Sequence, residues 1–168
     1  MLLLWKGIGH YLVRHPQYRY LFGPVSISSD YSERSRQLIT SALTRHYQIQ
    51  ELSSLVSSRM PVGIRRMKIS GIDPAQSDPL LQDIENISAL VADFENDGKG
   101  VPVLLRHYLS LGGKLLAFNL DPDFSDVIDG LLLVDLLEAD ARQLQRYMER
   151  DGYRAYLHFQ KEGTRDCA

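Results

Sequence analysis

The chain has 168 residues, a length typical of one domain with its own hydrophobic core. Hydrophobic residues make up 44% of the sequence and charged residues 24%, which excludes a disordered or fibrous protein. The net charge of −2 argues against nucleic-acid binding through overall charge, and we expect no nucleic-acid partner. A single cysteine, Cys167, excludes an intrachain disulfide and favours a reducing compartment. No apolar run is long enough to span a bilayer, so we expect a cytoplasmic protein.

The first predicted elements are an apolar helix and a strand. Residues 2–14 carry apolar side chains around most of the helical circumference, so we expect a helix that is buried on several sides. Gly7 and Gly9 within it predict close packing against a neighbouring element. Residues 18–27 are rich in aromatic and β-branched side chains, which predicts a strand. Pro24 in its middle indicates an edge position or a bulge.

Three helices are predicted next. Asp30 and Glu33 have the spacing of a capping box, so we expect a helix from there to about Tyr47. Asp78 is the expected N-cap of a second helix, because a proline follows it directly. Pro102 is expected to open the third.

Two buried strands and a last helix complete the predicted domain. The short apolar runs 114–120 and 130–136 are typical of buried strands. A helix is predicted over residues 138–149, and residues 152–159 form a helical or strand-like tail. Helices that alternate with apolar strands indicate a mixed α/β domain.

The sequence lacks the common signatures of metal and nucleotide sites. No GxSxG, Walker A or GxGxxG segment is present. No two histidines have the i, i+4 spacing of a helical zinc site. We therefore expect neither a metal site nor a tightly bound cofactor.

Five segments follow one another in the order found in one known family. They are LLLWKGIGHYL (2–12), YRYLFGPVSISSDYS (18–32), VPVLLRHYLSLGGKLLAFN (101–119), DPDFSD (121–126) and DGLLLVDL (129–136). The chain resembles the C-terminal part of the ornithine-lipid-type N-acyltransferases, also called hemolysin-like acyltransferases, which depend on an acyl carrier. These are similar in fold to the GNAT superfamily and to acyl-homoserine-lactone synthases.

This resemblance implies a fold and a domain organisation. It implies a GNAT-like mixed sheet flanked by helices over residues 1–150. Within this range, residues 51–76 lack a clear periodicity, so we expect an inserted loop or arm there, and a short strand near 64–69 could lie within it. Residues 151–168 are then a C-terminal tail. A GNAT-like domain normally begins with four further strands and two helices, so we expect these to lie upstream of Met1.

The resemblance also implies an activity. The enzyme would move a fatty acyl group from acyl carrier protein or coenzyme A, as co-substrate, to the amine of a small amino acid such as ornithine or glycine, in aminolipid synthesis. An alternative is a non-catalytic half-domain or binding module, which needs an upstream domain or a second polypeptide to supply the missing strands. A third is a fragment without activity.

Tyr31 is the candidate catalytic residue. In GNAT-like enzymes the acid that protonates the departing thiolate, where identified, is often a tyrosine at the start of the helix after the fifth strand. Tyr31 occupies the matching position after the strand of residues 18–27. The structural alternative is a tyrosine that fastens the start of the helix to the core.

Candidate substrate-binding residues are polar side chains near the predicted cleft. Ser26 and Ser28 could hydrogen-bond an amino acid, or could simply solvate a turn. Arg106 could pair bidentately with a substrate carboxylate, or could be an ordinary surface arginine. Asp121 and Asp123 could hold an ammonium group or act as base, and Asx turns explain them equally well.

A cationic cluster lies within the predicted arm. It could dock an acidic acyl carrier protein or an anionic membrane at the inner face, or it could be a solvated basic loop. Its members are Arg59, Arg65, Arg66 and Lys68.

Overall fold

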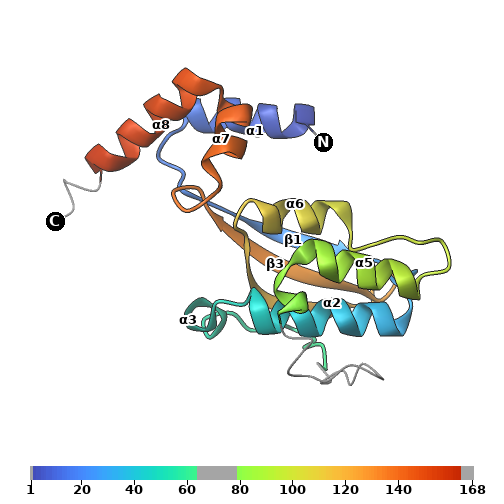
Figure 1. The fold of residues 1–168 in the computed structure, drawn as a ribbon. Coiled ribbons are helices and arrows are strands. Elements are labelled where there is room, and N and C mark those ends of the chain that lie inside the picture. Colours follow the sequence, from blue (N-terminus) through green and yellow to red (C-terminus); the bar gives the residue numbers. More distant parts are fainter. Residues whose placement is uncertain (1, 64–78, 164–168) are drawn as a thin grey trace. The chain divides into compact units, whose positions relative to one another are not determined.

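The computed structural model describes residues 2–63 and 79–163, and the chain divides into two compact units. One unit combines Met1–Leu21 with Val134–Ala168, and the other is Phe22–Leu133. Figure 1 shows their elements along the chain. Asp78 and the strand expected near residues 64–69 lie outside the described residues.

A three-stranded sheet runs through the larger unit in the order β1-β3-β2. The strands are β1 (Tyr20–Ile27), β2 (Lys114–Asp121) and β3 (Val127–Asp135). β2 pairs antiparallel with β3, from Lys114 opposite Leu133 to Asp121 opposite Val127. β1 is an edge strand of this sheet, as Pro24 predicts, because proline has no N–H to donate to a second neighbour.

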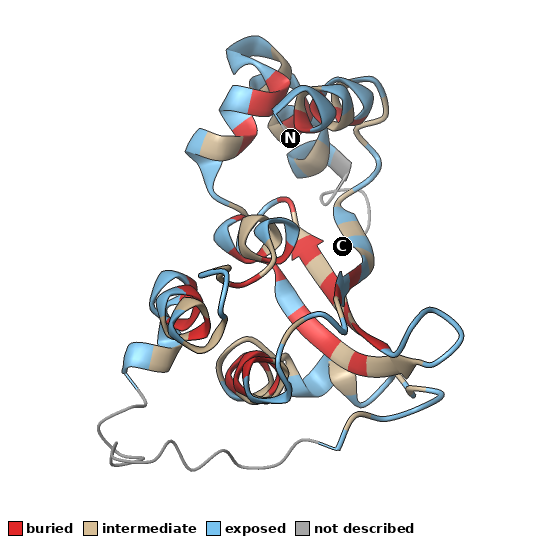
Figure 2. Ribbon diagram, turned by 90° about the vertical axis from the view of Figure 1, so that its right-hand side faces the viewer, coloured by how far each residue is buried: buried red, intermediate tan, exposed pale blue. Residues whose placement is uncertain are grey.

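Three helices gather on one side of the sheet (Figures 1 and 2). They are α2 (Glu33–His46), α5 (Ile84–Phe94) and α6 (Val103–Ser110); the shorter helical turns α3 (Gln50–Ser53) and η1 (Leu80–Gln82) flank them. The core lies between these helices and the sheet, where side chains such as Ile27, Leu43, Ile87, Leu105 and Leu132 are at most 1% exposed. The prediction of an α/β domain with helices flanking a sheet is confirmed, and the arrangement is compatible with a partial GNAT-like fold.

The N-caps differ from those expected. Ser32, not Asp30, caps α2: its hydroxyl oxygen accepts from the Ser35 N–H at 3.2 Å, and Glu33 is the first helical residue. The Asp30 carboxylate instead accepts from the Ser28 hydroxyl at 2.9 Å, within the turn that precedes the helix. Asp83 caps α5 by accepting from the Glu85 N–H at 2.9 Å.

The smaller unit contains α1 (Leu2–Arg14), α7 (Ala141–Met148) and α8 (Arg150–Gly163). Helix α1 is confirmed, but burial on several sides is wrong for the part of the chain that the structure describes. Trp5, Gly9 and Leu12 form the buried side, whereas Leu3 is 85% and Leu4 60% exposed. Only the side of α1 that carries these three residues, which are spaced i, i+4 and i+7, is therefore buried.

Close helix packing is confirmed at Gly9 and wrong at Gly7. A Cβ atom at Gly9 would lie 2.4 Å from the Tyr147 carbonyl oxygen of α7, whereas one at Gly7 would have no neighbour within 4 Å. The Trp5 and Tyr147 rings stack beside this contact, with centroids 5.5 Å apart. Gly9 thus lets the α1 and α7 backbones touch.

Polar contacts fix the segment that follows α1. The Arg19 guanidinium donates to both carboxylate oxygens of Asp135, at 2.8 and 2.5 Å. The hydroxyl of the buried Tyr156 on α8 donates to the Tyr18 carbonyl at 2.8 Å. None of the helices within residues 2–63 and 79–163 has the length and apolar character needed to cross a membrane.

Candidate functional site

A pocket of about 520 Å³ lies between α5, the loop that follows it and the start of α6. Small residues, Ala89 and Ala92 from α5 and Gly98 from the loop, line part of it. Its charged and hydrogen-bonding side chains are Tyr31, Glu85, Ser88, Lys99 and Arg106. The structure therefore brings two predicted site residues, Tyr31 and Arg106, to one cavity.

The loop is fastened to α5 through Ser88. The Ser88 hydroxyl oxygen accepts from the Val101 N–H at 3.1 Å. A Cβ atom at Gly100 would lie 2.1 Å from that oxygen and 3.0 Å from the Ser88 carbonyl oxygen, so a larger residue would displace the hydroxyl from the Val101 N–H. Pro102 then serves as the N-cap residue of α6, in agreement with the predicted helix start.

Tyr31 lies one residue before the Ser32 cap, and its ring packs against the core. Its hydroxyl donates to the Gly100 carbonyl at 2.7 Å, which joins the start of α2 to the loop. The Lys99 Nζ lies 4.7 Å from the centroid of the ring. Burial raises the pKa of the phenol, and the Lys99 cation partly opposes that effect. At neutral pH the hydroxyl therefore keeps its proton.

The Glu95 carboxylate also contacts the start of α2. The Glu95 Oε1 atom accepts from the Ser32 N–H at 2.9 Å, and its side chain is only 6% exposed. Hydrogen bonds from the Ser35 and Ser32 side chains and from the Ser32 N–H, together with the Lys99 cation, lower the pKa of Glu95 to about 2. The Lys99 Nζ lies 3.6 Å from Glu95 and 3.5 Å from Asp97.

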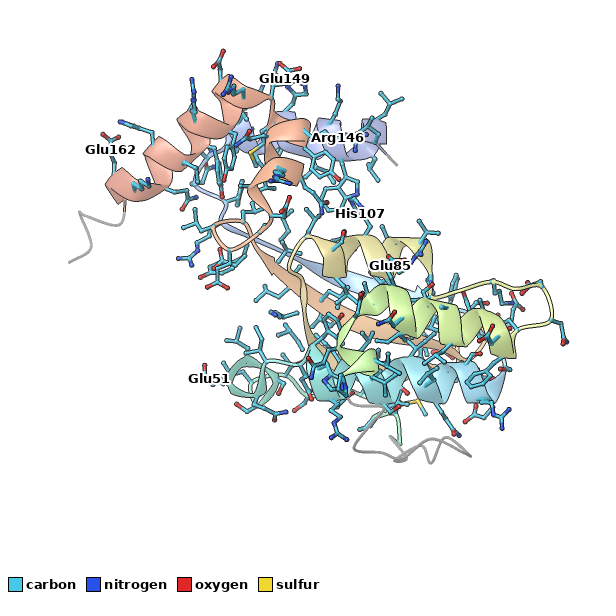
Figure 3. All side chains as sticks on the ribbon, in the orientation of Figure 1. Glu51, Glu85, His107, Arg146, Glu149 and Glu162 are labelled. Atoms are coloured by element: carbon cyan, nitrogen blue, oxygen red, sulfur yellow. The ribbon has the colours of Figure 1, made fainter. Side chains whose placement is uncertain are left out.

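Arg106 reaches the pocket from the middle of α6. Its Nη1 donates to the Glu85 Oε2 at 2.9 Å, which joins α6 to α5. Glu85 is labelled in Figure 3. The Arg106 Nε is enclosed and has no hydrogen-bond acceptor among the described residues. The Glu85 side chain is 65% exposed and that of Arg106 34%. Within the described residues, the guanidinium therefore has its hydrogen bond through Nη1 and none through Nε.

The other predicted substrate-binding residues do not line this pocket. The Ser26 hydroxyl donates to the Asp129 Oδ1 at 2.6 Å, and the Ser28 hydroxyl takes part in the turn with Asp30. The Asp121 Oδ1 accepts from the N–H groups of Asp123 and of the following residue, both at 3.1 Å. The first contact joins the neighbouring strands β1 and β3, and the others stabilise the turns before α2 and after β2.

The cationic cluster is only partly within the described residues. Arg59 is exposed. The neighbouring Met60 carbonyl accepts a hydrogen bond from the N–H of Leu120, near the end of β2, at 2.9 Å, which fastens this part of the arm to the sheet. Arg65, Arg66 and Lys68 lie outside the described residues. Where the structure describes the chain, no three His, Cys, Asp or Glu side chains gather as metal ligands would.

Comparison with known proteins gives one distant relative. No family model matches the chain, and no solved structure matches it. The chain is similar to a glycine N(alpha)-acyltransferase of Bacteroides thetaiotaomicron, with 27% identity over 159 residues. The match covers 87% of this chain but 44% of the relative, so the chain spans less than half of that protein's length. The similarity supports a relationship to acyltransferases in general.

Proposed function

We propose that this chain carries part of an N-acyltransferase, which moves a fatty acyl group from a thioester to the amine of a small amino acid. The donor is acyl carrier protein or coenzyme A, and glycine and ornithine are the proposed acceptors, in aminolipid synthesis of the ornithine-lipid type. The similarity to a glycine N(alpha)-acyltransferase supports the reaction class. The observation that carries the proposal is the pocket lined by both the Tyr31 phenol and the Arg106 guanidinium.

In this reaction the amine nitrogen attacks the thioester carbonyl, and a tetrahedral intermediate forms. The C–S bond then breaks, and the proton that the nitrogen gives up neutralises the departing thiolate, so the products are an amide and a thiol. We assign to Tyr31, which lines the pocket and keeps its hydroxyl neutral, the hydrogen bond that stabilises this thiolate as it departs. Complete transfer of the phenol proton to the thiolate is unfavourable, because the pKa of a thiol, about 8.5, is lower than that of a phenol. Tyr31 therefore acts mainly by hydrogen-bonding the developing thiolate, and the nearby Lys99 cation lowers the cost of partial phenolate character.

The Gly100 carbonyl competes for the same proton. Tyr31 donates to it at 2.7 Å, so the hydroxyl must turn from that carbonyl toward the thiolate during the reaction. The phenolic oxygen can also accept a hydrogen bond while it donates one. The hydrogen bond to the Gly100 carbonyl thus positions the Tyr31 hydroxyl before the acyl donor binds.

The cationic cluster is the proposed docking surface for the acyl carrier protein. Such carriers are acidic, and opposite charge speeds encounter and fixes orientation. Arg59 is exposed at the described end of the cluster. An anionic membrane surface is the other partner of suitable charge, and it would be held reversibly, because each cation contributes only about 1 kcal/mol there.

A second candidate function is a binding module without catalysis. It is favoured by the fact that Tyr31 and Arg106 already have protein partners, the Gly100 carbonyl and the Glu85 carboxylate. In that case the two side chains fasten α2 and α6 to the rest of the unit.

Acyl transfer by Tyr31→Phe distinguishes the two functions. The chain, and the longest polypeptide encoded in frame with it, are incubated with acyl carrier protein thioester and glycine or ornithine, and the N-acyl product is measured by mass spectrometry. Loss of the Tyr31 hydrogen bond to the developing thiolate should lower the rate by about 10- to 150-fold, because a hydrogen bond to a charged group is worth about 1.5–3 kcal/mol. Tyr153→Phe, on α8 and not among the residues that line the pocket, is the control. Product formation that Tyr31→Phe leaves within twofold assigns Tyr31 to packing, and no product from either polypeptide favours the binding module.

A further inference from the structure

We infer that the pocket binds the carboxylate of a small ligand through Arg106, and that Glu85 occupies the ligand's place on the guanidinium when the pocket is empty. The ligand's identity as the acceptor amino acid rests on the proposed function. Carboxylate binding itself does not, because it needs no acyl donor.

The state of the Arg106 side chain is the first argument. A guanidinium has five N–H donors in a planar fork and pairs best with a carboxylate through two parallel hydrogen bonds. Arg106 has a hydrogen bond to Glu85 through Nη1, while its enclosed Nε has no acceptor among the described residues. The pair with Glu85 therefore uses the fork incompletely. Because Nε is buried, a ligand would reach the guanidinium through its two Nη atoms, and a carboxylate that accepts from both would use the fork more fully.

The exposure of Glu85 is the second argument. Its side chain is 65% exposed, so the carboxylate regains water as soon as it leaves Arg106 (Figure 3). Exposed ion pairs are weak, typically worth less than about 1 kcal/mol. A ligand carboxylate that loses water on entering the pocket needs a cation there, and Arg106 is released at small cost.

The second cation of the pocket is less available. Lys99 lies within 4 Å of two carboxylates, those of Glu95 and Asp97, and its ammonium also donates to the Asp30 carbonyl at 3.2 Å. These carboxylates raise the pKa of Lys99 although burial opposes its charge. A small anion is therefore directed to Arg106.

The shape of the pocket fits a small ligand with further reactants beside it. Its volume of about 520 Å³ lies within the range of small-molecule sites. Ala89 and Ala92 place no long side chain in the space next to Glu85 and Arg106. A glycine-sized ligand on Arg106 fills only part of the cavity, and Tyr31 lines the same cavity.

Competition by Glu85 predicts an unusual result. Glu85→Gln removes a negative charge from the pocket and should tighten carboxylate binding by about two- to fivefold, the range expected for an exposed ion pair. Arg106→Gln should weaken binding on the order of tenfold or more. Arg106→Lys keeps the charge but loses the fork, and should fall between wild type and Arg106→Gln.

The test is an NMR titration of the full chain with glycine and acetate as probes and no acyl donor present. Glycinamide, which lacks a carboxylate, is the matched probe. Glu51→Gln is the matched variant, because Glu51 is an exposed carboxylate on α3 outside the pocket (Figure 3). Circular dichroism checks that each variant is folded.

The inference is supported if glycine and acetate bind, glycinamide does not, Glu85→Gln binds more tightly and Glu51→Gln binds as wild type. It is overturned if neither carboxylate binds to wild type or to Glu85→Gln, if Glu85→Gln weakens binding, or if glycinamide binds as well as glycine. Glycine binding without acyl transfer contradicts only the proposed function. Acyl transfer that does not depend on Arg106 contradicts the identification of the ligand as the acceptor amino acid and leaves the proposed function standing.

Discussion

Replacement of Gly9 by alanine tests the contact between α1 and α7. The added Cβ would lie 2.4 Å from the carbonyl oxygen of Tyr147, 2.6 Å from its carbon and 3.0 Å from the Met148 nitrogen. All three atoms are backbone, so no side chain can rotate out of the way. Ordinary contact begins near 3.4 Å, and α1 must therefore move away by roughly 1 Å.

Two effects of opposite sign decide the size of the change. Overpacking of this kind costs about 1–3 kcal/mol. Alanine in place of glycine inside a helix stabilises by about 0.5–1 kcal/mol. Gly9→Ala should therefore lower the free energy of unfolding by roughly 1–2 kcal/mol, because a shift of α1 also disturbs the Trp5–Tyr147 stack. Gly7→Ala meets no atom within 4 Å and should only gain the helix-propensity term.

The chain offers a direct assay for this comparison. It contains one tryptophan, Trp5, which stacks on Tyr147 within the smaller unit. Urea unfolding followed by tryptophan fluorescence therefore reports on that unit. The reasoning is refuted if Gly9→Ala is as stable as Gly7→Ala.

Three further predictions concern the larger unit and the arm. Because the folded-state pKa of Glu95 is lowered from 4.5 to about 2, the unfolded state binds more protons between these values, so stability should fall as pH drops through this window. Glu95→Gln should flatten that fall in acid-unfolding curves, and an unchanged pH profile would contradict the assignment. Tyr31→Phe removes the hydrogen bond to the loop and should lower the free energy of unfolding by about 1 kcal/mol in chemical denaturation. If it lowers that free energy no more than Tyr153→Phe does, the hydrogen bond does not stabilise the fold. Reversal of Arg65 and Arg66 to glutamate should weaken binding to acyl carrier protein at low salt and less at high salt, as ion screening requires; biosensor titrations that show equal affinity would leave the arm a solvated loop.

Residue patterns in the sequence locate the strands and most helices, since burial on a sheet or on one side of a helix requires those patterns. Cap positions are harder, because several capping residues stand close together. Asp30 and Ser32 are both good N-caps, and the choice depends on the Ser28 hydroxyl, which engages Asp30. The prediction that α1 is buried on several sides is wrong for a related reason. A helix that is apolar all round does not reveal which side is covered, and here the close approach at Gly9 selects the side.

The candidate site divides into what side-chain chemistry predicts and what only the fold can supply. Tyr31 and Arg106 stand out in the sequence because their chemistry suits an acid and a carboxylate partner. Their meeting in one pocket depends on the loop after α5, which Ser88 and Gly100 hold against that helix. The Gly98-Lys99-Gly100 segment is the signal that could have indicated a loop in close contact with its surroundings.

Glu85 had no such signal. In the sequence it is a glutamate in the first turn of a helix, where acidic residues are common because they favour the positive end of the helix dipole. Its contact with Arg106 joins two separate helices at positions 21 residues apart in the sequence, so no helical spacing rule connects the two residues. The residue proposed to compete for the ligand's place is thus one whose role depends on tertiary structure alone. On this proposal the charge of Glu85 lowers the affinity for a carboxylate, while its oxygen holds Arg106 in the pocket. Glu85→Gln separates these two effects, because it removes the charge and keeps an amide oxygen that can accept from Arg106.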